Sequence, residues 1–322
     1  MKKTTFLFAL CAIVSAFLFS CSKKPDTVSS STGTTYSSMD AVFGMLSLQP
    51  KTLTVDAAIG GSFYGNSGTR YIFYGNTFQT ATGASVTGNM QIEVTEYLNK
   101  GDMLFSKMLP ISNNEPLISG GEISVVATQN GQPVYLKYMN TFQAHIPQPG
   151  GAPSGMEIFI GQPNLDTSKF KANWILAKND TTRYNIGVVI IKSTGGIDTL
   201  NIISDSLTRC NADGFMTSPN YQTFTVTITT TGATLPSTGN VYGYALYDNY
   251  KGVWPLYSYN STDKVFSEHH VPNIPVHFVV FTLINGKFFG GTLAATPATG
   301  TNYIVNLTQV DPVTFKTQLN AL

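Results

Sequence analysis

Alternation of apolar and polar residues is the strongest periodic signal in this chain. Threonine occupies every second position of 222–229, and in 88–97 the apolar Met90, Ile92 and Val94 alternate with polar residues. Successive side chains of a strand point to opposite faces of a sheet, so a period of two is typical of half-buried antiparallel strands. Between 39 and 142 no stretch shows a convincing helical period. The pattern predicts an all-β fold.

Two asparagine–glycine pairs predict tight hairpins, because both residues readily adopt the positive φ angles of a type I′ turn. Asn130-Gly131 separates expected strands at 122–128 and 134–138, and Asn285-Gly286 separates expected strands at 276–284 and 287–293. Further strands are expected at 53–55, 71–73, 184–191, 222–230, 241–247 and 303–307.

Proline and glycine indicate where the chain divides. Residues 146–155 contain three prolines and three glycines, a composition typical of a linker. Asp311-Pro312 is typical of a helix N-cap followed by proline in the first turn, which places Phe315 and Leu319 on one helix face. We therefore expect two tandem β-sandwich (Ig-like) domains, over 39–145 and 156–322, the second ending in a short helix.

The N-terminus has the pattern of an export signal. Lys2 and Lys3 precede the apolar run 6–19, which is too short for an ordinary membrane span. The segment Leu18-Phe19-Ser20-Cys21 resembles a bacterial lipobox. Residues 1–20 are thus expected to be a lipoprotein signal peptide, and 21–38 a lipidated Cys21 followed by a Ser/Thr-rich tether. Acyl chains such as palmitate on Cys21 would anchor the protein to the membrane. An ordinary secretory signal cleaved elsewhere is the alternative.

Composition restricts the function classes. With 19 Lys+Arg against 18 Asp+Glu and no basic block, the chain lacks the clustered cations that neutralise phosphates, so no nucleic-acid partner is expected. Loss of Cys11 with the signal and acylation of Cys21 leave Cys210 without a disulfide partner, and we expect it to be buried. Nucleophile-elbow, glycosidase-pair and phosphate-loop patterns are absent. A non-enzymatic protein without a cofactor is expected.

Two segments carry a family resemblance. The first contains Gly68-Thr69-Arg70, the strand ending Glu93-Val94-Thr95-Glu96, the pair Asp102-Met103 and the turn Ser119-Gly120-Gly121-Glu122. This order resembles an N-terminal β-sandwich domain of cell-envelope lipoproteins of the Bacteroidota. Cys210-Asn211-Ala212-Asp213 resembles, with altered order and spacing, a short signature in the second half of the same lipoproteins. The resemblance implies an anchored all-β envelope protein and brings no catalytic residues with it.

Three histidines provide the candidate metal ligands. Glu268, His269 and His277 combine a carboxylate with imidazoles, which suits zinc or a similar ion. Adjacent His269 and His270 would point to opposite faces of a regular strand, however. Solvated loop histidines without a metal are the alternative and the expected state.

An aromatic cluster between 242 and 259 is the candidate ligand-binding surface. Exposed aromatic rings can stack on sugars, and nearby Asp248, Asn249 and Asn260 offer polar contacts. Packing inside a sandwich is the alternative, because aromatic residues are common in strands. The candidate binding residues are Tyr242, Tyr244, Trp254, Tyr257 and Tyr259.

Four Asp-Ser/Thr segments resemble the O-glycosylation site of exported proteins in that phylum. The acceptors that the resemblance implies are Thr27, Thr181, Thr199 and Ser206. Ordinary loop and strand composition is the alternative.

Together these observations predict an outer-membrane lipoprotein, at the periplasmic face or the cell surface, with a structural, interaction or ligand-binding role. The membrane is the expected partner through the anchor, and an envelope protein or a glycan is a further one. Glycan or peptide binding through 242–259 is one alternative, and a metal-dependent hydrolase using Glu268, His269 and His277 is another.

Overall fold

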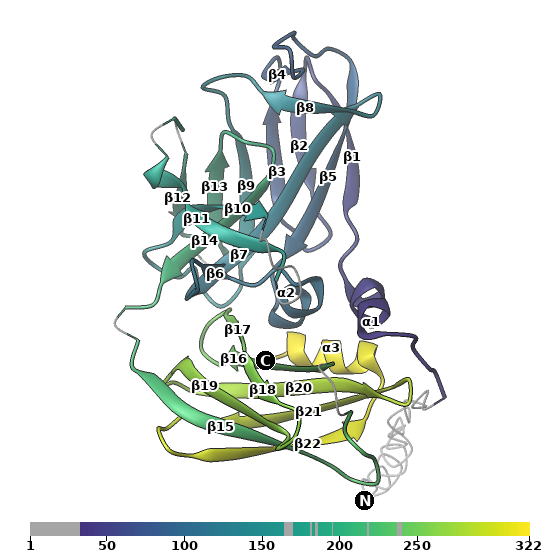
Figure 1. The fold of residues 1–322 in the computed structure, drawn as a ribbon. Coiled ribbons are helices and arrows are strands. Elements are labelled where there is room, and N and C mark those ends of the chain that lie inside the picture. The colour runs from purple at the N-terminus through teal and green to yellow at the C-terminus, as the bar shows by residue number, and fades with distance from the viewer. Residues whose placement is uncertain are drawn as a thin grey trace, which may run out of the picture. The chain divides into compact units, whose positions relative to one another are not determined.

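Strands dominate the computed structural model, which describes residues 33–163, 170–180, 182–183, 186–194, 196–217, 219–236 and 240–322 (Figure 1). The predicted signal peptide, Cys21 and the tether up to residue 32 lie outside these residues. The described part of the chain belongs to one compact unit, Thr32–Leu322. The predicted all-β, sandwich-type fold with a short C-terminal helix is confirmed.

Two sheets pack face to face in the first sandwich and enclose one apolar core. The larger sheet has the central order β1-β5-β7-β14-β10-β11, and the smaller has the order β12-β13-β9-β3-β2. The strands of the larger sheet are β1 (Lys51–Asp56), β4 (Phe78–Gln79), β5 (Asn89–Tyr97), β6 (Ile111–Ser112), β7 (Glu115–Gln129), β8 (Gln132–Leu136), β10 (Glu157–Pro163), β11 (Ala172–Leu176) and β14 (Arg209–Phe215). Those of the smaller sheet are β2 (Gly60–Tyr64), β3 (Arg70–Tyr74), β9 (Phe142–Gln148), β12 (Gly187–Ile191) and β13 (Asp198–Ser204). A single 3₁₀ turn, η1 (Ala177–Asn179), follows β11.

The third sheet folds back on itself and forms the second sandwich. Its order is β17-β16-β20-β21-β22-β15-β19-β18. Strand β22 pairs with β21 through two residue pairs but runs parallel to β15 through six. Phe224 of β15 consequently packs against Phe278 of β20, with ring centroids 5.2 Å apart, although two strands separate them in the sheet. The strands are β15 (Tyr221–Thr230), β16 (Val241–Tyr247), β17 (Val253–Pro255), β18 (Ser258–Asn260), β19 (Val265–Pro272), β20 (Val276–Ile284), β21 (Lys287–Ala295) and β22 (Asn302–Gln309).

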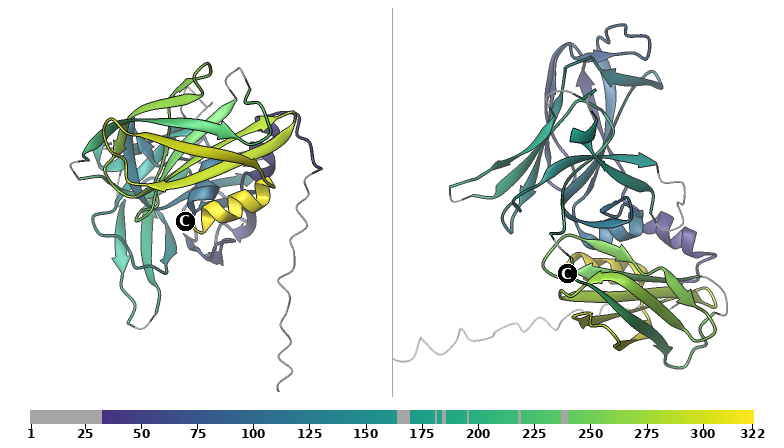
Figure 2. Two further views of the ribbon diagram at one scale, coloured as in Figure 1. Left: turned by 90° about the horizontal axis from the view of Figure 1, so that it is seen from below. Right: turned by 60° about the vertical axis from the view of Figure 1, so that its left-hand side comes forward.

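Three helices, α1 (Met39–Leu46), α2 (Lys100–Ser106) and α3 (Pro312–Asn320), pack on the third sheet and share its core (Figures 1 and 2). Asp311 caps α3 by accepting a hydrogen bond from Thr314 N at 2.9 Å, as its sequence predicts. Helices α1 and α2 are corrections to the expectation that 39–142 contains only strands. None of the helices among the described residues combines the length and the apolarity needed to cross a membrane.

The predicted domain boundary at 146–155 is wrong. Residues 146–148 belong to β9, which pairs with β13 over seven residues. Strand β10, just beyond the predicted linker, pairs with β14, and β14 pairs with β7. Residues up to 215 therefore complete the first sandwich, and the second begins at β15. The Pro/Gly-rich segment is a connection within one sandwich.

Both predicted hairpin turns form. Asn130 and Gly131 have φ angles of 52° and 74°, and Asn285 and Gly286 have φ angles of 53° and 76°. Positive φ at both central residues is the requirement of a type I′ turn, which matches the twist of the flanking strands.

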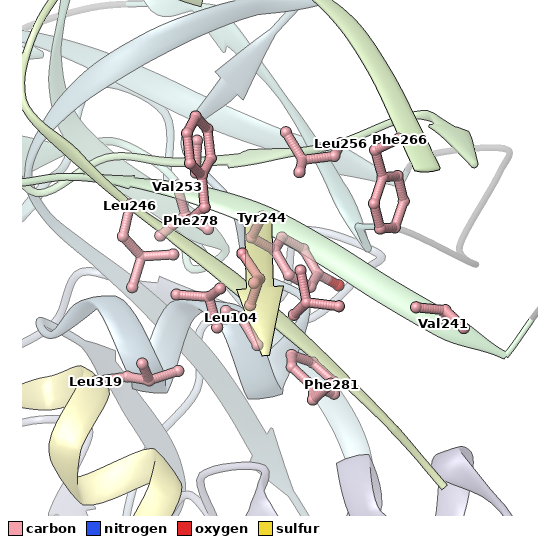
Figure 3. Packing of buried hydrophobic residues seen from close by; sticks show 14 of the residues in the cluster. Leu104, Val241, Tyr244, Leu246, Val253, Leu256, Phe266, Phe278, Phe281 and Leu319 are labelled. Carbon is pink, nitrogen blue, oxygen red and sulfur yellow. The ribbon is translucent and has the colours of Figure 1, made fainter. Parts of the chain in front are cut away.

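Phe281 of β20 is a buried member of the second core (Figure 3). It is fully buried and contacts the rings of Phe43 in α1, Phe105 in α2 and Phe315 in α3. This one ring contacts helices that lie more than 200 residues apart in the sequence, so its removal should destabilise the second sandwich as a whole.

We expect Phe281→Ala to lower the free energy of unfolding by about 3–5 kcal/mol, because the cavity removes packing on all three helices. Guanidinium denaturation measures the change. Ile304→Ala, at a side chain that is 57% exposed, is the control and should change it by less than about 0.5 kcal/mol. A loss below about 1 kcal/mol for Phe281→Ala would contradict this contribution of the ring.

Candidate functional site

The segments that carry the family resemblance meet on two paired strands. In the register of β7 and β14, Glu122 lies opposite Asn211 and Ser119 lies opposite Asp213. Glu122, Asn211 and Asp213 have no exposed surface, and Ser119 is 1% exposed. The segment Ser119-Gly120-Gly121-Glu122, expected as a turn, lies within β7, and together with the Cys-Asn-Ala-Asp segment of β14 it forms one buried polar cluster.

The Asn211 amide connects the members of this cluster. Its Nδ2 donates to Glu122 Oε1 at 3.4 Å and to Asp213 Oδ2, and its Oδ1 accepts from Ser119 Oγ at 3.1 Å. Among the described residues, Glu122 Oε2 and Asp213 Oδ1 have no hydrogen-bond partner. A buried carboxylate without full compensation is unfavourable, so the cluster favours a protonated state.

Burial raises the pKa of both carboxyl groups well above their ordinary values. The negative charge of Asp213 further raises the pKa of Glu122. Contacts of Asp213 with Ser119, Asn211 and the Gly120 N–H partly offset the effect on its own pKa. The pair therefore retains a proton at a pH at which exposed carboxyl groups are ionised.

A bulge and two glycines make room for the cluster. The register of β14 with β7 shifts between Ala212 and Asp213, opposite the glycine pair. A Cβ at Gly120 would lie 2.2 Å from Leu200 Cδ1 of the facing sheet, and Gly121 has a φ of 143° that other residues rarely adopt. Gly120 is required because the facing sheet leaves no space for a side chain, and Gly121 is required because of its backbone conformation.

Beside the cluster lies a pocket with a volume of about 740 Å³, which we name the junction pocket. Its walls come from both sandwiches, because the loop after β16 contributes Asn249, Tyr250 and Lys251. The first sandwich contributes the segments 98–99, 118–119 and 147–153 together with Ser67 and Ile197. The volume is within the range of small-ligand sites.

Hydrogen bonds to the rest of the fold hold three of the polar wall residues of the junction pocket in place. Ser67 N donates to Glu96 Oε2 at 2.7 Å, and Asn99 Nδ2 donates to Asp102 Oδ2 at 3.0 Å. Gln148 Nε2 donates to Gly120 O at 2.7 Å. Glu96 and Asp102 belong to the segments that carry the resemblance, so those segments support the pocket from behind.

Main-chain contacts hold the loop of the second sandwich against the first. Ser119 N donates to Lys251 O at 2.8 Å, and the two residues form an isolated antiparallel bridge. Lys100, the first residue of α2, donates through its Nζ to the carbonyl oxygens of Tyr247, Asp248 and Leu322. The distance to the Leu322 oxygen is 2.9 Å. The position of the loop that carries Tyr250 is thus determined by hydrogen bonds to the first sandwich.

The aromatic cluster at 242–259 is mainly a packing surface, which corrects its interpretation as an exposed platform. Tyr244 is 2% exposed and Trp254 has no exposed surface, so neither ring can stack on a sugar from solution. Tyr242, Tyr257 and Tyr259 are half-buried and pack against the same core. The residue that sequence reasoning left out of its binding set is Tyr250, which is 41% exposed and lines the junction pocket.

The predicted metal set Glu268, His269 and His277 is not assembled, which corrects that candidate site. His277 lies on β20, which three strands separate from β19 in the sheet order, and its Nδ1 is 2.7 Å from Asp248 Oδ1. His270 takes its place, since the ligand atoms of Glu268, His269 and His270 lie within 4.8 Å of one another.

A register shift explains why His269 and His270 come together. Strand β15 pairs Phe224 with Glu268 but Gln222 with Val271, so two histidines lie opposite one residue. Their ring centroids are 4.2 Å apart rather than on opposite faces. Glu268 is 2% exposed and its Oε1 accepts from the backbone N–H groups of both histidines, at 2.8 and 2.9 Å. The carboxylate therefore already stabilises the bulge.

Cys210 is buried, as predicted. Its thiol contacts Ser204 Oγ at 3.3 Å, and burial raises the pKa of the thiol to about 12. Of the predicted glycosylation acceptors, Thr27 and Thr181 lie outside the described residues. Thr199 is half-buried on β13, and Ser206 Oγ accepts from Arg183 Nη1 at 2.9 Å. Modification at these positions stays a prediction.

Comparison of the chain with protein-family models, with curated proteins and with solved structures gave no match.

The buried acid pair predicts how stability depends on pH. Because the folded state raises the pKa of Glu122 above its ordinary value of 4.5, the folded chain binds a proton that the unfolded chain releases. The free energy of unfolding should therefore fall as the pH rises above about 4.5, the ordinary value.

We expect Glu122→Gln to reduce this fall, because the neutral amide has no proton to lose. Denaturation midpoints between about pH 5 and 9 measure it. Glu93→Gln, at an exposed position on β5, is the control and should keep the wild-type slope. A Glu122→Gln slope equal to that of the wild type would show that Glu122 does not hold the proton.

Proposed function

We propose that this chain is a lipid-anchored lipoprotein of the bacterial cell envelope that binds a ligand, without catalysis, in the junction pocket. The pocket is the observation that carries the binding role. It combines an accessible tyrosine ring with hydroxyl and amide side chains on a framework held by hydrogen bonds.

The N-terminal pattern supports the location. Leu18-Phe19-Ser20-Cys21 follows a short apolar run behind two lysines, as in a lipoprotein signal. The Ser/Thr-rich tether that follows would hold the sandwiches away from the headgroups. The outer membrane is the proposed site of the anchor, and either of its faces is compatible with the sequence.

The pocket lining supports glycan binding as the more specific form of this proposal. Tyr250 offers a ring for stacking, and Ser67, Asn99 and Asn249 offer side chains that can exchange hydrogen bonds with sugar hydroxyls. A hydrolase is less well supported, because the predicted metal ligands are divided between separate strands and Glu268 is engaged by backbone amides.

Lipid attachment is tested by Cys21→Ala. We expect the wild-type protein to incorporate radiolabelled palmitate and to sediment with membranes, and the variant to do neither. Cys210→Ala is the matched control, because that thiol is buried, and it should keep the label. Labelling of the Cys21→Ala variant would contradict the anchor.

Ligand binding is tested on a glycan array with Tyr250→Ala. Loss of one stacking ring should weaken binding of the bound glycans about tenfold, since aromatic contacts contribute on the order of 1 kcal/mol beyond their buried area. Tyr135→Ala is the control, because Tyr135 is 48% exposed on β8 and does not line the pocket. Equal binding by both variants would exclude the junction pocket as the site.

A further inference from the structure

The junction pocket has an unbalanced charge. Lys251 is the one cationic side chain among its lining residues in the described part of the chain, and none of those residues is acidic. The polar lining residues are otherwise neutral hydroxyls and amides: Ser67, Asn99, Ser119, Gln148 and Asn249.

Lys251 also lacks a carboxylate partner within the protein. No ion pair among the described residues includes it. Burial lowers the pKa of its ammonium group, and no neighbouring acid offsets that effect. A partly desolvated cation without a counter-ion is unfavourable, and an anionic ligand in the pocket would relieve this.

The backbone presents Lys251 in a defined position. Its carbonyl accepts from Ser119 N at 2.8 Å, and Tyr247 N donates to Gly252 O at 3.1 Å on the other side of the loop. A Cβ at Gly252 would lie 2.3 Å from Tyr247 Cδ2, so the loop packs closely on β16. Tyr250 precedes Lys251 directly, and both residues line the pocket.

We infer, building on the proposed ligand-binding function, that the ligand of the junction pocket is an acidic glycan whose carboxylate pairs with Lys251 while a sugar ring stacks on Tyr250. A carboxylate accepts charge-assisted hydrogen bonds from the ammonium group. Asn99 and Asn249 are exposed and can bind the hydroxyls of the same sugar or of its neighbour. A sugar segment fits this lining better than a peptide, because amide and hydroxyl groups around one aromatic ring match a ligand rich in hydroxyls.

Calorimetry with matched ligands tests the inference on the full chain. The probes are oligogalacturonate, oligoglucuronate and sialyllactose, each with its carboxylates free and as the methyl ester. Esterification removes the charge and leaves the sugar unchanged. We expect the wild type to bind at least one free acid about tenfold or more tightly than its ester, in line with hydrogen bonds to charged groups.

Lys251→Met should remove this preference, so that acid and ester bind with equal, weaker affinity. Lys51→Met, on β1 and outside the pocket, is the control and should keep the preference. Thermal denaturation of each variant verifies that it folds.

The outcomes separate the two proposals. Equal binding of acid and ester by the wild type, with a loss in Tyr250→Ala, would overturn the acidic ligand and retain the pocket as a binding site. Binding of a peptide carboxylate in preference to every acidic glycan would overturn the glycan. If no acidic probe binds, the inference fails, and if Tyr250→Ala also leaves every array interaction unchanged, the proposed function fails with it.

Discussion

The pairing of β7 with β14 around two buried acids is the constraint on which the first sandwich depends. Glu122 and Asp213 have no exposed surface, Asn211 links them, and burial raises the pKa of both carboxyl groups, which favours a retained proton. The facing sheet approaches so closely that Gly120 has no room for a side chain. Packing, backbone conformation and protonation are therefore coupled at one place in the fold.

The same strand pair connects the two sandwiches. Ser119 belongs to the buried cluster through its side chain and holds Lys251 of the second sandwich through its backbone N–H. Lys100 makes a second connection to the end of β16. The junction pocket lies where these contacts bring the loop 249–251 against the Pro/Gly-rich segment 147–153. The residues that line it thus depend on the arrangement of the acid cluster, although the two acids themselves do not line it.

Local patterns predicted much of the fold and little of the site. The residues buried in α1, which are Met39, Val42, Phe43 and Leu46, have helical spacing, but eight residues offer only two turns of it. Every residue of α2 is buried, so no amphipathic pattern exists to be found. The aromatic segment 242–259 leaves binding and packing open, because alternation shows that two strand faces differ but not which of them meets the core. Tyr250 could have been noticed because it follows Asp248-Asn249, residues that are typical of a turn.

By itself the sequence determined the period-two strands, the two type I′ turns, the cap of α3 and the burial of Cys210, because each follows from residues close together in the chain or from their chemistry. Only the tertiary structure decided where the sandwiches divide, since β9, β10, β13 and β14 pair across the expected linker. It also decided which histidines meet, because one bulge rotates His270 towards His269. The junction pocket was likewise decided only by the tertiary structure. It depends on pairing between residues more than 100 positions apart in the sequence, such as Ser119 and Lys251, and no local pattern predicts such pairing.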